Sequence, residues 1–214
     1  MFKRSIYAIL AMILLLGLIP MAVAAPPSGS NVINVADYNA DSTGVQDACE
    51  AVKNALAAAK TLPEGENKTV YFPQGEYHFY ADYAQKKELY ISNTLGLNQS
   101  YKVKNIGILL EGMKNVTIDG CGSMFIYHGD ITSFAAIDCE NITFTNFSFD
   151  HASPSVVDMT VESKVEGENA VIFSVPACYD YTINGASIQW RGEVGPVTGN
   201  PYWQGSGNLQ HGQI

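Results

Sequence analysis

Apolar and polar residues alternate along much of the chain, and one alternating phrase occurs twice. Residues 115–118 read Asn-Val-Thr-Ile, and residues 141–144 read Asn-Ile-Thr-Phe, 26 residues later. Alternation with a period of two is the pattern of a β-strand. A period in the range of roughly 20–50 residues is typical of a solenoid, in which each repeat stacks on its neighbour.

Each period holds more than one strand-like run, and glycine-rich turns separate the runs. In the first period the runs are 108–110, 116–118 and 124–127. Three short strands in each turn of a coil is the plan of a right-handed parallel β-helix. We therefore predict an all-β fold in which residues 31–154 form the N-terminal cap and the first coils. Asn115 and Asn141 occupy equivalent positions, so we expect their side chains to stack and hydrogen-bond along the coil.

The residues before the repeats predict a cap for the coil. A strand is expected at 31–35, and the turn at 41–44 offers an N-cap for a helix over 45–60 whose apolar residues form one stripe. Two further strands flank the Pro-Gln-Gly turn at 73–75. A helix at the start of the solenoid would cover apolar side chains and strand edges that would otherwise be exposed.

The pattern changes after Pro154. Alternating runs at 156–165 and 170–175 predict one hairpin, and runs at 181–183 and 186–190 around Asn184 and Gly185 predict a second. Hairpins are not coils of a parallel solenoid. Residues 155–214 are therefore interpreted as the start of an inserted antiparallel β-barrel that is truncated at Ile214.

The first residues resemble a secretory signal peptide. Lys3 and Arg4 precede an apolar run over 6–19, and small residues at 22–24 suit a signal peptidase. We expect a leader over 1–24, a linker over 25–30, and a secreted or extracytoplasmic protein with no membrane segment once the leader is cleaved. An uncleaved N-terminal anchor is the alternative, although the run is short for a bilayer.

The net charge of the chain disfavours some classes of binding partner. Losing two cations with the leader takes the net charge from −9 to −11, which disfavours nucleic acid. The negative charge also disfavours binding of a strongly acidic polysaccharide, whereas a neutral sugar is not repelled.

The four cysteines match no zinc motif, so no metal or cofactor is predicted. They are either buried thiols or contain one disulfide: Cys49, Cys121, Cys139 and Cys178. Five glycosylation sequons begin at Asn67, Asn98, Asn115, Asn141 and Asn146.

Several short phrases, taken in order, resemble a known family. The Val-Tyr-Phe-Pro-x-Gly-x-Tyr phrase at 70–77 looks like the opening of the pectate-lyase-like β-helix superfamily. The later phrases resemble the N-terminal half of the α-1,3-galactosidase family of inverting glycoside hydrolases: Ser-Asn-Thr at 92–94, Ile-Leu-Leu-Glu at 108–111, Thr-Ile-Asp-Gly at 117–120, and the repeat closing at Asp150. The chain departs from the family at His151, where a tryptophan is common. The resemblance covers roughly residues 35–192.

The resemblance implies hydrolysis of terminal α-linked galactose with inversion, by a general acid and a general base. The family's catalytic carboxylates are expected in later coils, beyond Ile214, so none is assigned here. We accordingly expect the 214-residue chain to be inactive by itself. Two alternatives stay open: a pectate-lyase-like or polygalacturonase-like enzyme that degrades polysaccharide, and a non-catalytic glycan-binding surface module.

The chain still offers candidate residues for contact with a sugar. Substrate-binding candidates are Asn93, Glu111, His128, Asp150 and Trp190. Glu111 and Asp150, with Asp119 and Asp138, carry carboxyl groups at predicted strand ends, where the alternative role is to cap turns. Aromatic rings could stack on a pyranose, or simply pack in the core: Tyr90, Tyr127, Trp190 and Trp203. His128 is alternatively a hydrogen-bonded residue at a strand end.

Overall fold

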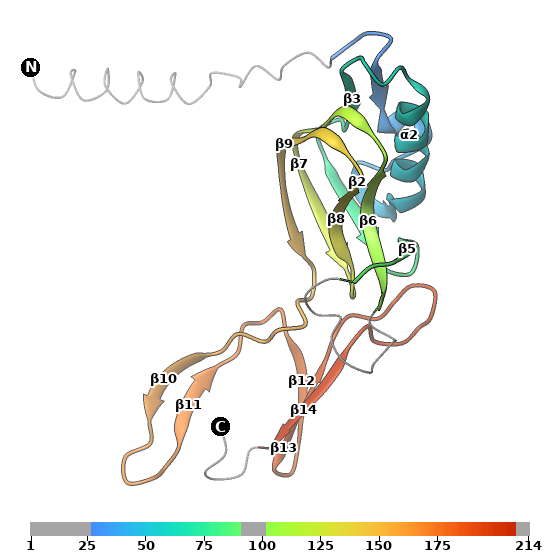
Figure 1. Cartoon of the computed structure of the whole chain (residues 1–214). Helices are drawn as coiled ribbons and strands as arrows, with labels where there is room; N and C mark the ends of the chain where they lie inside the picture. Colours follow the sequence, from blue (N-terminus) through green and yellow to red (C-terminus); the bar gives the residue numbers. More distant parts are fainter. Residues whose placement is uncertain (1–26, 91–101, 209–214) are drawn as a thin grey trace, which may run out of the picture.

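The computed structural model describes residues 27–90 and 102–208. The predicted leader and the candidate Asn93 lie outside these residues. Figure 1 shows a stack of coiled strands with one helix against its side, and a smaller group of antiparallel strands that extends from one end. None of the helices in the described ranges is long and apolar enough to cross a membrane.

Parallel strands from successive turns of the coil form its first wall. They are β1 (Val32–Asn34), β3 (Lys68–Tyr71), the first half of β7 (Lys114–His128) and the first half of β9 (Glu140–His151). The registers Val70↔Ile118 and Ile118↔Phe144 place each strand directly on its neighbour. The turn β3–β4 lies before the two repeats, so the coil has more turns than the repeated phrase alone indicated.

Two further walls close the coil. One contains β2 (Thr43–Asp47), β4 (Glu76–Tyr80) and the second halves of β7 and β9. The other contains β6 (Val103–Glu111) and β8 (Thr132–Ile137) in parallel, with β5 (Gln85–Glu88) antiparallel to β6. The predicted parallel β-helix is confirmed.

The helix α2 (Cys49–Thr61) covers the side of the coil near its N-terminal strands. It was predicted to begin at Val45, and that boundary is wrong. Residues 43–47 instead form β2, and Val45 is 79 % exposed. The Asp41 carboxylate accepts hydrogen bonds from the backbone N–H groups of Val45 and Gln46, which holds this stretch out of the helix. The predicted strand at 31–35 is also shorter, because the 3-10 helix η1 begins at Val35.

Aromatic rings from successive turns stack inside the coil. Phe72, Phe125 and Phe147 form a ladder with ring centroids 4.8 Å and 4.6 Å apart, in which Phe125 and Phe147 are stacked and Phe72 is tilted by 47° to Phe125. Phe72 and Phe125 are fully buried. Phe79 stacks on Tyr127 in the same way, with centroids 5.1 Å apart. Burial of large rings on each turn is what holds the turns together.

Polar side chains and a glycine form the corners. The predicted asparagine ladder is confirmed, because Asn141 Nδ2 donates to Asn115 Oδ1 at 2.7 Å and Asn115 Nδ2 donates to the Glu64 carbonyl. At the next corner, a Cβ on Gly120 would lie 2.4 Å from the Cβ of Phe147. The Thr-Ile-Asp-Gly phrase therefore ends in glycine because the following turn packs against it.

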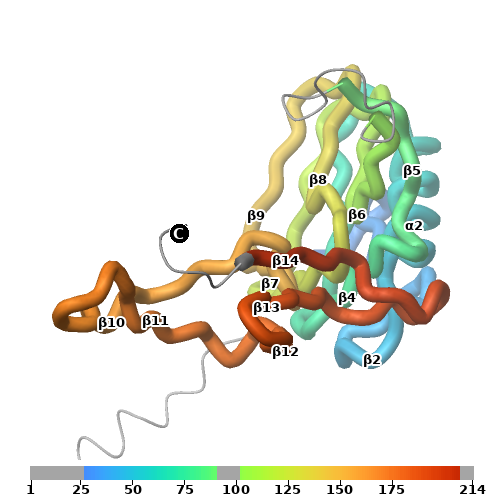
Figure 2. The backbone as a smooth tube through the Cα atoms, turned by 90° about the horizontal axis from the view of Figure 1, so that it is seen from below, coloured from blue at the N-terminus to red at the C-terminus, as the bar shows by residue number. Residues whose placement is uncertain are grey.

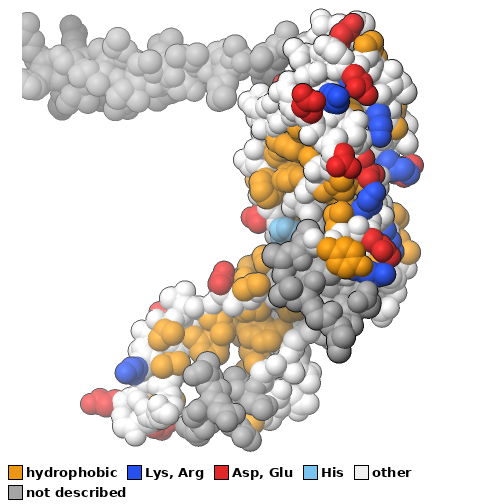
Figure 3. Space-filling model, in the orientation of Figure 1, with side chains coloured by type: hydrophobic (Ala, Val, Ile, Leu, Met, Phe, Trp, Pro, Cys, Tyr) orange, Lys and Arg blue, Asp and Glu red, His pale blue; other side chains and the backbone are white. Residues whose placement is uncertain are grey.

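The antiparallel strands follow β9, and both predicted hairpins are confirmed. The strands β10 (Thr160–Lys164) and β11 (Val171–Ser174) form one sheet. A second sheet contains β12 (Asp180–Asn184), β13 (Ser187–Arg191) and β14 (Gln204–Asn208). The link between β13 and β14 passes beneath the ends of the coil strands (Figure 2). In Figure 3, apolar side chains gather along the coil surface and again over these hairpins.

Candidate functional site

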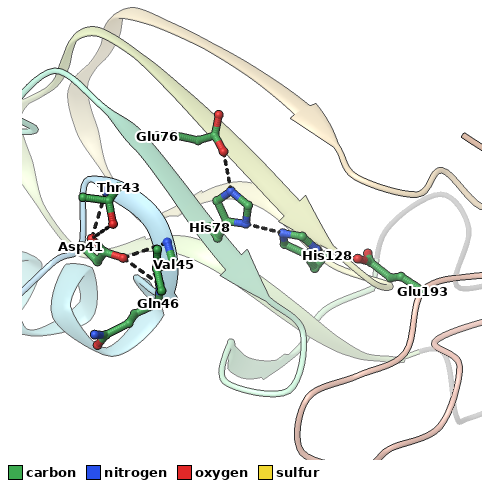
Figure 4. Close-up of polar contacts among 8 residues, drawn as sticks. All are labelled: Asp41, Thr43, Val45, Gln46, Glu76, His78, His128 and Glu193. Atoms are coloured by element: carbon green, nitrogen blue, oxygen red, sulfur yellow. Dashed lines mark hydrogen bonds and ion pairs between the residues drawn. The ribbon is translucent and has the colours of Figure 1, made fainter.

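Two histidines and two carboxylates form a continuous hydrogen-bonded row at the end of the coil (Figure 4). His128 Nε2 lies 2.8 Å from His78 Nδ1, and His78 Nε2 lies 2.8 Å from Glu76 Oε1. At the other end, His128 Nδ1 lies 2.6 Å from Glu193 Oε2. We call Glu76, His78, His128 and Glu193 the histidine row.

Strand alternation brings the two imidazoles together. On β4, Tyr77 and Phe79 point into the core, so His78 points outward. On β7, Phe125 and Tyr127 point into the core, and His128 shares the outward face. Because β4 and β7 pair in parallel, the two rings meet across the wall.

Glu193 arrives from the link between β13 and β14 and covers His128, which is only 6 % exposed. Its second carboxylate oxygen accepts a hydrogen bond from the Gly129 N–H at 3.0 Å. The row therefore fastens the antiparallel part of the chain to the end of β7. The structure thus places the candidate His128 in a partnered and largely structural position.

The row needs one more proton than two neutral imidazoles carry. Its three contacts each require one hydrogen, the two carboxylates are acceptors when ionised, and each neutral imidazole has one N–H. One of the three hydrogens must therefore be additional.

Tyr80 stacks on the exposed side of the row. Its ring lies 4.0 Å from that of His128 at an interplanar angle of 10°. The backbone N–H groups of Tyr80 and Cys49 both donate to the Asp47 carboxylate at 2.8 Å. Burial raises the pKa of Asp47 despite these hydrogen bonds. A groove of about 410 Å³ borders these residues, lined also by Gln46, Tyr83 and Pro196.

Three of the four carboxylate candidates make hydrogen bonds or ion pairs within the described residues. Glu111 forms an ion pair with Lys87. Asp119 Oδ1 accepts hydrogen bonds from the Cys121 N–H and from Asn146 Nδ2, both at 3.0 Å. Asp150 accepts from the N–H of His151. Asp138 is exposed in a left-handed turn with φ 51°. The turn-capping interpretation therefore describes Asp119, the structure pairs Glu111 with a lysine, and Asp150 is exposed near the end of β9.

The aromatic candidates differ in their surroundings. Tyr90 is 72 % exposed, whereas Tyr127 is fully buried in the aromatic core. Trp190 is half-buried against Tyr181, with centroids 5.2 Å apart. Trp203 Nε1 donates to the Ser153 carbonyl at 3.3 Å. Packing in the fold therefore accounts for Tyr127, Trp190 and Trp203.

All four cysteines are free thiols in the structure, which removes the disulfide alternative there. Cys49 is buried, and burial raises the pKa of its thiol. Cys178 is exposed. Among residues 27–90 and 102–208, the His, Cys, Asp and Glu side chains form no group of three or more that could hold a metal ion.

Sequence reasoning missed three members of the histidine row. His78, Glu76 and Glu193 were not singled out as candidates. The alternation Glu-Tyr-His-Phe at 76–79 carries a usable signal, since it places Glu76 and His78 on one face. No local signal brings Glu193 to a histidine 65 residues earlier.

The fold and the comparisons together define a class of protein. Residues 32–92 match the family described as "Rhamnogalacturonase A/epimerase, pectate lyase-like". This segment contains α2 and the first turns of the coil, so the chain has a β-helix of the pectate-lyase-like type.

Whole-chain similarity points to one group within that class. The chain is 44 % identical to "Alpha-1,3-galactosidase A" of Peterkaempfera griseoplana over 87 % of its length, and 42 % identical to that of Streptomyces avermitilis over 99 %. It is 31 % identical to "Alpha-1,3-galactosidase B" of Phocaeicola vulgatus over 75 % of its length. These alignments cover 26 %, 34 % and 26 % of the three relatives. The resemblance to the N-terminal portion of α-1,3-galactosidases is therefore confirmed, and the chain spans about a quarter to a third of these curated relatives.

Proposed function

We propose that this chain is a carbohydrate-active protein of the α-1,3-galactosidase kind, whose ligand is a glycan that ends in α-linked galactose. The observation that carries this proposal is the identity of 42–44 % over most of the chain to two proteins named α-1,3-galactosidase. The coil and its cap would supply the rigid framework that positions the glycan-binding surface. An acidic chain of net charge −9 suits a neutral sugar.

We infer further that the 214-residue chain does not hydrolyse this glycan by itself. Inverting hydrolysis needs one carboxylic acid and one carboxylate roughly 6.5–9.5 Å apart with space for water between them. Glu111 and Asp119 are held by a lysine and by a corner of the coil, and Glu76 and Glu193 are separated by two imidazole rings. These contacts favour a binding and positioning role for this part of the protein.

Galactose release tests this proposal. The purified chain is incubated with α-1,3-linked galactobiose, and free galactose is measured against the complete Streptomyces avermitilis relative as the positive control. We expect no release above the uncatalysed rate from this chain. Release that depends on the chain would contradict the proposed division of roles, and the variants Glu111→Gln and Asp150→Asn would then identify the carboxylates responsible.

Export is part of the proposal. Its support is the order of Lys3 and Arg4, an apolar run and small residues at 22–24, which suits a cleaved leader. Mass spectrometry of the N-terminus from an expressing culture checks it. We expect a mature protein that begins at Ala25 and lies outside the cytoplasm, whereas an intact Met1 terminus in a membrane fraction would indicate an anchor.

A second candidate function follows from the pectate-lyase-like match at 32–92. It would make the protein a lyase or hydrolase of pectin-like polysaccharide. Unsaturated products from pectin in the presence of calcium would favour this candidate over the galactosidase kind.

A further inference from the structure

The three-stranded sheet β12–β14 carries a groove of about 390 Å³. Residues opposite one another in antiparallel strands share a face, and alternate residues point to opposite faces. The registers therefore place two polar rows on the groove face: Asp180, Arg191 and Gln204 in one, and Thr182, Gln189 and Ser206 in the other.

The residues between these rows belong to the opposite face. Tyr181, Trp190 and Gly205 face one another in register, and the rings of Tyr181 and Trp190 pack together. Ile188 lies on the same face and is only 6 % exposed. The sheet thus has one apolar face for packing and one polar face, and the backbone of the middle row is the floor of the groove.

The polar side chains of the groove form no hydrogen bonds or ion pairs with other residues that the structure describes. None of the six makes a side-chain hydrogen bond or ion pair there. Ser187 on the same sheet, in contrast, donates to the Gly207 carbonyl. Six polar side chains that converge on one hollow without internal partners leave their hydrogen-bonding capacity available to a ligand.

The chemistry of the groove fits a neutral sugar. Hydroxyl and amide groups both donate and accept, as sugar hydroxyls require, while Asp180 accepts and Arg191 donates. The charges of Asp180 and Arg191 cancel, so the groove carries no net charge to attract an acidic polysaccharide. Its volume falls within the range of about 300–1,000 Å³ that is usual for small-ligand sites.

We propose that the β12–β14 groove binds a neutral galactose-containing oligosaccharide through hydrogen bonds from its two polar rows. This inference rests on the proposed function, and it names the surface that holds the glycan. The groove acts as a binding surface and has no part in bond cleavage.

Binding of α-1,3-linked galactobiose to the full chain tests the inference, measured by saturation-transfer NMR and titration calorimetry. The double variant Thr182→Ala/Gln189→Ala should bind at least about tenfold more weakly, which corresponds to about 1.4 kcal/mol. The matched control is Thr160→Ala/Ser163→Ala, which removes two exposed polar groups from the neighbouring hairpin and should bind as the parent does. Equal unfolding midpoints for the three proteins would show that the fold is retained.

The possible outcomes distinguish the groove proposal from the broader proposed function. If the parent and the groove variant bind equally, the assignment of binding to the groove is overturned while the proposed function stands. If the parent binds no galactoside, both are overturned. Preferential binding of digalacturonate over galactobiose would contradict the neutral character of the site.

Discussion

His128 Nε2 lies 2.8 Å from His78 Nδ1, so two imidazoles on adjacent turns of the coil share one hydrogen. With Glu76 and Glu193 at its ends, this row needs three hydrogens, one of them additional to those of two neutral rings. Nitrogen-15 NMR of the imidazole rings should therefore show His78 Nδ1 and His128 Nε2 hydrogen-bonded to each other.

The variant Glu76→Gln tests the proton count directly. The glutamine amide can donate to His78 Nε2, which Glu76 as a carboxylate cannot do. The row then needs no hydrogen beyond those of two neutral rings, so the variant should keep its fold and its contact between His78 and His128. Loss of that contact in the variant would refute this account.

Acid should loosen the loop that precedes α2. Hydrogen bonds from the Thr43 hydroxyl and from the N–H groups of Thr43, Gln46 and Val45 lower the pKa of Asp41 from 3.8 to about 2. A carboxylate whose pKa is lower in the folded state contributes stability above the unfolded value, and this contribution is lost as pH falls from about 4 to about 2. Asp41→Asn should therefore be less stable at pH 7 and lose less stability across this window, as urea unfolding at each pH would show. Parallel curves for the two proteins would contradict the assignment.

Removing one ring from the aromatic ladder should be costly. Phe125 is fully buried between Phe72 and Phe147, so Phe125→Ala leaves a cavity and should lower the free energy of unfolding by about 3–5 kcal/mol. Phe149→Ala is the comparison, because Phe149 is 54 % exposed and should cost less than about 1 kcal/mol. Urea denaturation measures both, and equal losses would argue against a ladder that holds the turns together.

The corner at Gly120 should not accept a side chain. A Cβ there would meet Phe147 at 2.4 Å, whereas nothing lies within 4 Å of a Cβ on Gly65. Gly120→Ala should lower the free energy of unfolding by at least about 1–3 kcal/mol through overpacking, and Gly65→Ala should be near neutral. A Gly120→Ala protein as stable as the parent would show that the corner can move apart.

The stacked architecture could be predicted because its signal is local and repeated. The phrases at Asn115 and Asn141 give the strand period, the spacing of the turns and the asparagine ladder that the structure contains. The helix start was misplaced at Val45 because a side-chain carboxylate competes there with the helix for backbone N–H groups. The Asp41 carboxylate binds the N–H groups of residues 45 and 46, which extends this segment as β2 until Ala48.

The site was harder to predict for a physical reason. The partners of His128 come from β4 and from a link more than 60 residues later, and only the folded coil brings them together. The groove on β12–β14 likewise depends on strand register. That register puts Thr182 and Gln189 on one face, while the candidate Trp190 packs on the other.

The most direct test of the account is to compare two galactobioses that differ in their linkage, with the full chain and saturation-transfer NMR. We predict that the chain binds the α-1,3-linked disaccharide and releases no galactose from it, and that it binds the β-1,4-linked disaccharide more weakly. Equal signals from both sugars, or no signal from either, would contradict the central claim that this chain recognises glycans with terminal α-galactose.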